Sequence, residues 1–482
     1  MLSSQAVPEA NHPSLRRQLR LGDLVLTQIL CVVGSSWVGI AAGLGRGQAV
    51  TWMAAMLIFY LPMAASVICL NREMPLEGGL YVWARRAFGN FVGFLVAWNL
   101  WIYAVAVTAT ILYAIPTEIS YLVGPRAAWL PENRIASLGI VILFLLAIAT
   151  AAARGLDIGK WIHNVGGIAM IAVFAALILL PVWALLHHAP IHWEPLPMQI
   201  PRRSLLSLAL FGQMIFGALC GLEYIAILAG ESRSPARAIG QSVLIASPII
   251  CAMFILGTGS VLAFAHGRVD LIAPIPQTLR LALGNSGIGG LLAVIAIALL
   301  QLRLIGASSF LFTGATRLSM AAGWDHLLPA WFTRLHPRWQ TPTNSILFTT
   351  ALIVATLVLA TTGVHAQEAF QVLSNASITH YELTYMAMFL VPIAGSRTLR
   401  RALPAWLRWT SATGLCATMF AFVLSAYPFV DVVNTRAYAA KILGTTAVSN
   451  IVAALFYAAR QRAEARRLEA AQTAAEVQSD LG

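Results

Sequence analysis

Long apolar runs constrain the fold of this 482-residue chain more than any other feature. Hydrophobic residues make up 59% of the sequence and charged residues only 10%. A soluble domain carries about 25% charged residues, and a helix needs about 20 apolar residues to cross a bilayer. We therefore expect an all-α polytopic membrane protein. Twelve spans are expected, at roughly 22–46, 50–70, 90–123, 135–153, 162–186, 204–229, 240–265, 287–315, 343–362, 368–394, 405–427 and 437–459.

The basic residues support this topology. The formal net charge is +12, but the bases are dispersed over short loops and form no patch for nucleic acid. With the N-terminus inside, the segments on the inner side hold more than twice as many bases as the outer loops, as the positive-inside rule requires. The chain is therefore expected in the plasma (inner) membrane with both termini cytoplasmic. Its environment is the lipid bilayer, and no nucleic acid partner is expected.

The first span contains a cluster of small residues near the middle of the membrane. Residues 33–39 read Val-Gly-Ser-Ser-Trp-Val-Gly, in which Gly34, Ser35, Ser36 and Gly39 are poor helix formers. Such a cluster is typical of a broken helix, where secondary transporters hold their substrates. The alternative is a seam of small residues at which two helices pack closely.

The sixth span carries a similar cluster, with Gly212, Gly217-Ala218 and Cys220-Gly221 near mid-depth. The two clusters lie five spans apart, so two five-span repeats would have opposite orientations in the membrane. Corresponding interruptions in two such halves are the best sequence indication of a transport site. The pair therefore favours broken helices at both positions.

Five motifs resemble the amino acid–polyamine–organocation (APC) superfamily, which includes the amino acid permeases. Gly34-Ser35-Ser36 is similar to its Gly-Ser-Gly break in span 1, and 216–223 to its broken span 6. The resemblance covers roughly residues 20–400. The other motifs are 73–83 (similar to Pro-x-x-Gly-Gly-x-Tyr, and continued by Arg85, Arg86, Phe88 and Gly89), 229–235 (similar to Ala-Gly-Glu-x-Lys-x-Pro), and 317–325 with Leu328-Pro329 and Thr341-Pro342 (similar to the connection of spans 8 and 9).

The resemblance implies a LeuT-type fold of two inverted five-helix repeats with two additional C-terminal helices. It also implies transport of amino acids, polyamines or related organic cations, by symport or exchange. The implied segments are a cytoplasmic N-terminal segment (1–21), a first repeat (22–186), a second repeat (204–394), two additional helices (405–459) and a cytoplasmic tail (460–482).

A zwitterionic substrate would need partners for one carboxylate and one ammonium group, and a broken helix supplies both from its backbone. Around Gly34, we expect Ser35, Ser36 and Gly39 on the carboxylate side, and the carbonyls of Val33 and Phe216 on the ammonium side. Trp37 is either a lid or a packing residue. The remaining expected residues are Gly217, Ala218 and Gly221, which leave room for the substrate side chain, and Tyr103, Ala104 and Thr108, which the resemblance assigns to the pocket in span 3.

Ionisable residues within spans are candidates for coupling or gating. Glu223 follows the break in span 6 and is either a proton carrier or gating group, or a structural anchor. His380 and Glu382 in span 10 form either a proton relay or an internal polar network. Arg303 needs a partner, for which Glu223, Glu382 and a substrate carboxylate are the candidates. Glu118 is expected to be structural, near the outer end of span 3.

The coupling ion is not determined by the sequence. Ser308-Ser309 is similar to the hydroxyl pair of sodium-coupled relatives, whereas the span 5 lysine of some proton-coupled relatives is missing from 163–167. Sodium, a different proton carrier and ion-free exchange all stay open, and no other cofactor is expected. The five cysteines lie in apolar runs and are interpreted as buried small residues. No catalytic motif indicates an enzyme. The predicted function is a secondary active transporter that moves amino acids or related small amines by alternating access. The alternatives to this function are a polyamine or organic-cation transporter and a non-transporting membrane sensor of the same fold.

Overall fold

The computed structural model of the protein describes residues 20–74, 79–188, 191, 193–194, 196–223, 235–265, 269–321, 328, 330–432 and 434–480. Within these residues, every regular element is a helix. The helices are α1 (Leu21–Val32), α2 (Ser35–Ala42), η1 (Gly45–Gly47), α3 (Gln48–Ala55), η2 (Met56–Tyr60), α4 (Leu61–Glu73), α5 (Leu80–Phe88), α6 (Asn90–Tyr113), α7 (Ile115–Val123), η3 (Pro125–Ala127), α8 (Arg134–Arg154), α9 (Leu156–Leu186), α10 (Leu205–Gly212), η4 (Gln213–Ala218), α12 (Pro235–Phe264), α13 (Pro274–Leu283), α14 (Gly287–Ala321), α15 (Ala330–Thr333), α16 (Thr343–Ala360), α17 (Ala366–Ala394), α18 (Arg397–Ala402), α19 (Trp406–Leu424) and α20 (Thr435–Asp480).

Nine helices of the described chain are long and apolar enough to cross a membrane, and the pair α1 and α2, bent by 45°, makes a tenth candidate. The expected polytopic, all-helical membrane protein is therefore confirmed. Two further expected spans fall below this threshold. α10 continues into η4 as a shorter apolar helix, and α17 has 29 residues but a more polar sequence. The count of twelve spans depends on these two segments and stays a prediction.

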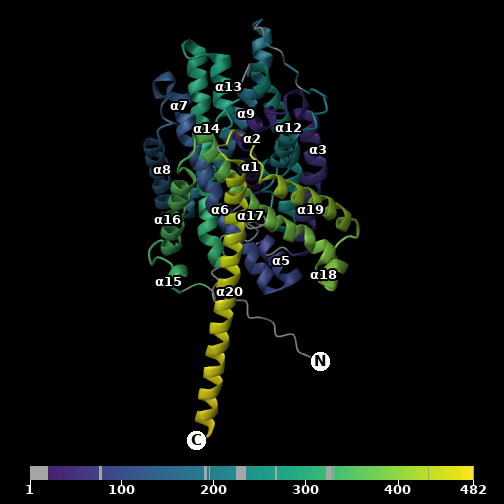
Figure 1. Cartoon of the computed structure of the whole chain (residues 1–482), viewed down its shortest axis with the longest axis vertical. Helices are drawn as coiled ribbons and strands as arrows, with labels where there is room; N and C mark the ends of the chain where they lie inside the picture. Colours follow the sequence, from purple (N-terminus) through teal and green to yellow (C-terminus); the bar gives the residue numbers. More distant parts are fainter. Residues whose placement is uncertain are drawn as a thin grey trace.

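The interior of the bundle is built around α6, α14 and α17 (Figure 1). α17 packs against α6 and α19, and α14 packs against α9 and α6. The apolar stretch that contains α6 and α7 is 67% buried, whereas that of α20 is only 17% buried. The broken pair α1 and α2 contacts α12, α9 and α14, so protein rather than lipid surrounds the break. Exposed backbone groups are tolerated at membrane depth only in such a place.

Two segments of π-helix interrupt the regular spans. η2 links α3 to α4, and η4 follows α10 directly before the second small-residue cluster. The two π segments contact each other. A π turn inserts a residue into the helix and rotates the turns after it, and such insertions are frequent at functional sites.

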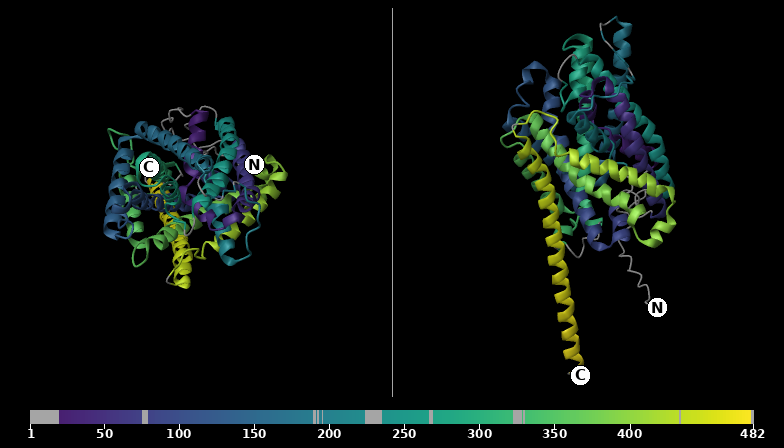
Figure 2. Two further views of the ribbon diagram at one scale, coloured as in Figure 1. Left: turned by 90° about the horizontal axis from the view of Figure 1, so that it is seen from above. Right: turned by 45° about the vertical axis from the view of Figure 1, so that its right-hand side comes forward.

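The last helix differs from expectation. We expected the final span to end near residue 459 and a tail (460–482) to follow it, but α20 is one helix of 46 residues that includes most of this tail. It extends far beyond the bundle (Figures 1 and 2). Residues 435–480 contain no proline, and Ala, Glu and Arg dominate the segment after 458. These are strong helix formers, so nothing in the sequence stops the helix where it leaves the apolar region.

The two ends of the bundle carry different elements. α5 and α18 lie at the same end as the extension of α20, whereas α7 and α13 lie at the opposite end (Figure 1). The basic residues of α5 and α18 (Arg85, Arg86, Arg397, Arg400 and Arg401) are therefore gathered at one end of the molecule.

Candidate functional site

The first break lies between α1 and α2. Val33 and Gly34 have extended backbone conformations, with φ and ψ of −80° and 104° and of −99° and 137°. The helix resumes at Ser35, and no side chain caps this new N-terminus. An uncapped helix start carries free N–H groups and a partial positive charge, which together suit an anion. Ser35 is buried, and Ser36 is partly exposed.

The second break follows η4. The helix ends at Ala218, and Leu219 to Glu223 continue without regular helix. Gly221 has a φ of +111°, in the region that glycine adopts and other residues rarely do. Phe216, Gly217 and Ala218 are buried within η4. The helix of the sixth apolar stretch therefore ends at the predicted cluster, which we call the second break, and residues 224–234, with most of the motif at 229–235, lie outside the described residues.

Trp37 connects the two breaks. A Cβ atom added to Gly34 would lie 2.6 Å from the Trp37 indole, and one added to Gly217 would lie 2.5 Å from the far edge of the same indole. The indole therefore lies across both glycines, and it is partly exposed. Both positions require glycine because the ring leaves no room for a methyl group.

Gly39 has a different neighbour. A Cβ at this position would meet Pro274 of α13 at 2.8 Å and the Asp270 carbonyl oxygen at 3.2 Å. Its small size lets α2 approach α13. On this geometry Gly39 serves helix packing, while Ser35 and Ser36 lie at the free helix start.

Aromatic rings line the second break. Tyr103 of α6 stacks on Tyr381 of α17 with ring centroids 3.7 Å apart. Tyr381 in turn meets the edge of Phe216 at 5.8 Å. Phe59, from the π segment η2, lies 5.3 Å from Phe216. Of the three expected pocket residues on α6, Tyr103 thus contacts the aromatic group, while the buried Thr108 hydroxyl donates to the carbonyl of the third, Ala104.

A hydroxyl that the sequence did not single out organises the second break. The Gly221 N–H donates to the Tyr385 hydroxyl oxygen at 2.9 Å, and the Tyr385 O–H donates to Oε2 of Glu223. Tyr385 also packs against the edge of Phe216, with centroids 4.9 Å apart. Glu223 is fully buried, and its Oε1 has no hydrogen-bond partner among the described residues. The weak signal for Tyr385 was its position one turn after Tyr381 on α17.

At the first break, a charged side chain rather than a neutral hydroxyl binds the free backbone group. Arg303 of α14 is 4% exposed, and its guanidinium donates to the Val33 carbonyl oxygen at 2.9 Å. Neither Glu223 nor Glu382 pairs with it. The acid within electrostatic range is Glu118, which is fully buried and also accepts a hydrogen bond from Gln301 at 3.0 Å. The carbonyl that was expected to face an ammonium group therefore already accepts a bond from a resident cation.

The remaining candidates lie around these groups. Ser308 and Ser309 are buried on α14, and the Ser308 hydroxyl has no hydrogen-bond partner in the described part of the chain. His380 uses Nδ1 on the Ala376 carbonyl of its own helix at 2.7 Å. Glu382 is fully buried, and Ser425 lies beside its carboxyl. No group of three or more His, Cys, Asp or Glu side chains suited to a metal occurs within the described residues.

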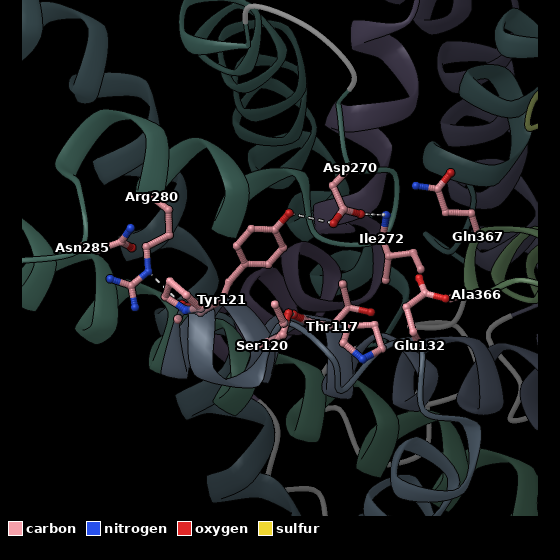
Figure 3. A pocket seen from close by; sticks show the side chains of 14 residues that line it. Thr117, Ser120, Tyr121, Glu132, Asp270, Ile272, Arg280, Asn285, Ala366 and Gln367 are labelled. Atoms are coloured by element: carbon pink, nitrogen blue, oxygen red, sulfur yellow. Dashed lines mark hydrogen bonds between the residues drawn. The ribbon is translucent and has the colours of Figure 1, made fainter.

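A cavity of about 390 Å³ opens at the α7 and α13 end of the bundle. Figure 3 shows the Tyr121 hydroxyl pointing to Asp270, to which it donates at 2.9 Å. Arg280 holds the same region by donating to the Tyr121 carbonyl oxygen at 2.8 Å. The Asp270 carbonyl adjoins Gly39 on α2, so this cavity lies next to the helix that begins at the first break.

The sequence pattern of one protein family, described as "Amino acid permease", matches residues 24–448. The chain belongs to this family. Both breaks and the cavity lie within the matched region of the permease. Neither the family nor its relatives are enzymes.

Individual relatives of the permease are distant but cover most of its length. An uncharacterized transporter of Legionella pneumophila is 25% identical over 78% of this chain and 81% of its own. A probable agmatine/putrescine antiporter of Lactococcus lactis is 24% identical over 78% of each chain. A branched-chain amino acid permease of Bacillus subtilis is 23% identical over 68% of this chain and 72% of its own. The relatives thus include transporters of amino acids and of amines.

Proposed function

We propose that this permease is a secondary active transporter that moves amino acids or related small amines by alternating access. The observation that carries the proposal is the position of Trp37, whose indole lies across the glycines of both breaks. A group in this position can respond to a substrate that contacts both breaks at once. The two broken segments are the parts of a transporter that bind substrate and rearrange around it.

The topology that we propose has twelve spans in a LeuT-type arrangement. Residues 22–186 and 204–394 form the inverted repeats, and 405–459 form the additional helices. The interrupted segments are then the first span of each repeat. Both termini, with segments 1–21 and 460–482, are proposed to be cytoplasmic, because the basic helices α5 and α18 gather at the end to which α20 extends (Figure 1) and positive loops stay inside.

A zwitterionic amino acid is the substrate class that we favour. The free N–H groups at Ser35 and Ser36 suit a carboxylate, and Tyr103, Tyr381 and Phe216 supply an apolar surface for a side chain. A polyamine lacks a carboxylate and would need several acids close to the breaks. In the described structure, the acids near the breaks are Glu223 at the second and Glu118 at the first, and Glu118 lies within electrostatic range of the resident cation Arg303. One acid without a cation is too few for a polyamine, which supports the zwitterion.

For the coupling ion we favour a proton over sodium. Arg303 already places a fixed positive charge against the Val33 carbonyl. A sodium ion held by Ser308 and Ser309 would lie about 8 Å further along the axis of α14. At an effective dielectric constant of about 20, two like charges at that distance repel by about 2 kcal/mol. Ion-free exchange is the remaining alternative.

Counterflow in proteoliposomes tests the proposal. Purified protein is reconstituted with internal unlabelled substrate, and uptake of labelled neutral, acidic and basic amino acids and of diamines is compared, with sodium or potassium as the only cation. We expect exchange of at least one zwitterionic amino acid, unchanged when potassium replaces sodium. Ligand binding without exchange for every compound would contradict transport and favour a sensor. Exchange of diamines alone would favour the polyamine alternative.

A further inference from the structure

One face of α17 carries polar side chains that the substrate site does not use. Glu368, Gln371, Asn375 and Glu382 are all buried. Their spacings of three, four and seven residues place them on one stripe of a helix, because about 3.6 residues complete a turn. The stripe runs about 21 Å along the helix axis, from its outer end to mid-helix. We call these four residues the α17 stripe.

The stripe faces the region where α19 ends and α20 begins. The Asn375 amide donates to the Ser425 carbonyl at 2.9 Å and to the Tyr438 hydroxyl at 2.8 Å. Glu368 lies within electrostatic range of the Tyr438 hydroxyl. The Ser425 hydroxyl donates to the Ala421 carbonyl at 3.1 Å and lies beside the Glu382 carboxyl, outside regular hydrogen-bond geometry. Asn375, Ser425 and Tyr438 thus connect the two ends of the stripe.

Several atoms of the stripe have no protein partner. Both carboxyl oxygens of Glu382, Oε2 of Glu368 and both amide atoms of Gln371 lack hydrogen bonds within the described residues. Nor does any described Lys, Arg or His lie within 4.0 Å of either carboxyl. Leaving a polar group buried and unpaired is costly. Water and protons are the ligands that such a row of carboxyl and amide groups can satisfy.

Both ends of the stripe connect to features already described. At the outer end, Ala366 and Gln367, which precede Glu368, line the cavity of Figure 3. At the inner end, Glu382 lies one helical turn before Tyr385 on α17, and the Tyr385 hydroxyl donates to Glu223 at the second break. The stripe therefore extends from the cavity toward the second break along a route that avoids Trp37 and the aromatic rings.

We propose that the α17 stripe is a proton path, separate from the substrate route, that links the cavity at the outer end of α17 to Glu223. A proton from outer water binds a carboxylate oxygen of Glu368, passes through bound water and the hydroxyls of Tyr438 and Ser425 to Glu382, and then reaches Glu223. Each carboxyl returns to its starting state when the proton leaves toward the inside. This inference rests on the transport function proposed above and specifies its coupling.

Other titratable groups near Glu382 do not provide an equivalent route. His380 lies on a different face of α17 and bonds to the Ala376 carbonyl. Tyr381 stacks on Tyr103 of α6, and Tyr385 bonds to Gly221 and Glu223 at the second break. The Cys220 thiol donates to the Gly217 carbonyl of its own segment. Ser425, the residue after α19, lies beside the Glu382 carboxyl. Glu382 is thus the acid of the stripe that lies nearest to the second break.

The test separates exchange from proton-driven accumulation. Wild type, Glu382→Gln and Glu382→Asp are reconstituted with the amino acid that counterflow identifies, and a pH-sensitive dye inside the vesicles records proton entry. We expect Glu382→Gln to retain counterflow within about twofold, but to lose accumulation driven by an inward pH gradient, and the accompanying proton entry, at least tenfold. Glu382→Asp should restore both in part. Glu464→Gln, which neutralises an exposed acid of α20, should behave as wild type.

Three results would overturn the proton path. One is proton-driven accumulation by Glu382→Gln at the wild-type rate. Another is counterflow reduced as strongly as accumulation in a Glu382→Gln protein that melts at the wild-type temperature. The third is net uptake of the amino acid by wild type without any accompanying proton entry. If wild type exchanges no amino acid or amine at all, the proposed transport function fails instead, which keeps the two proposals distinguishable.

Discussion

Both breaks leave backbone groups that need a hydrogen-bond partner, and the partners differ in chemistry. At the first, a buried cation on α14 binds the free carbonyl of Val33. At the second, the neutral hydroxyl of Tyr385 on α17 binds the Gly221 N–H and Glu223. A fixed charge holds one position strongly, whereas a hydroxyl can exchange its partners at low cost. The comparison indicates that the first break is the fixed half of the site and the second is the half that responds to substrate and protons.

The largest effect is expected from Arg303→Met. It leaves the Val33 carbonyl and Glu118 without their cation, and losing one partner of a buried charge costs about 3–5 kcal/mol. Counterflow should fall at least about 100-fold, with a lower melting temperature, and Arg303→Lys should recover part of both. Arg134→Met is the control, because Arg134 also donates to a carbonyl of another helix, that of Val358, but at an exposed position. Counterflow by Arg303→Met within threefold of wild type would contradict the claim that a fixed charge distinguishes the first break from the second.

Tyr385→Phe removes the hydroxyl of the second break and keeps its ring. A hydrogen bond to a charged group contributes about 1.5–3 kcal/mol, so we expect counterflow to fall about tenfold or more with little change in melting temperature. Glu223→Gln should have a similar effect, and the double variant should be no worse than the more severe single one, since both act through one contact. Additive losses would show that the two residues act independently. Tyr457→Phe provides a matched control at a partly exposed position.

Gly217→Ala and Gly34→Ala test whether Trp37 lies across both breaks. Each adds a methyl group within 2.6 Å of the indole, and such crowding costs about 1–3 kcal/mol. Counterflow should fall about fivefold in both variants, and adding Trp37→Phe should restore part of it. Gly240→Ala should be neutral, since its Cβ would meet Ile68 at 3.7 Å, an ordinary contact. An effect at only one glycine would show that Trp37 belongs to a single break.

The smallest effect is expected from Thr108→Val. Its hydroxyl bonds to the Ala104 carbonyl of the same helix, so its removal should change the apparent substrate affinity less than twofold. A change of tenfold or more in affinity, measured by concentration-dependent counterflow, would place Thr108 in direct contact with substrate and extend the site onto α6.

The sequence predicted the breaks because their cause is local. Gly34 and Gly217 sit in clusters of poor helix formers at corresponding positions of the two halves, and this correspondence is the sequence indication of a break. The partners of the breaks were not predictable in the same way. Arg303 was recognised as needing a partner, but its bond to the Val33 carbonyl depends on how α14 packs beside α1. Tyr385 looked like one more aromatic residue of α17 until the packing of α17 against η4 set its hydroxyl beside Gly221.

The central claim, that substrate binds between the two breaks, is tested most directly by Gly217→Trp. Its matched control is Gly139→Trp, which adds the same side chain where no atom lies within 4 Å of the new Cβ. Binding by ligand-induced melting and counterflow are measured on the purified proteins. We predict that Gly217→Trp folds but melts below wild type, because the new side chain displaces Trp37, and that it neither binds nor exchanges the amino acid, while Gly139→Trp does both. Normal binding and exchange by Gly217→Trp would contradict the account, because the substrate would then bind elsewhere.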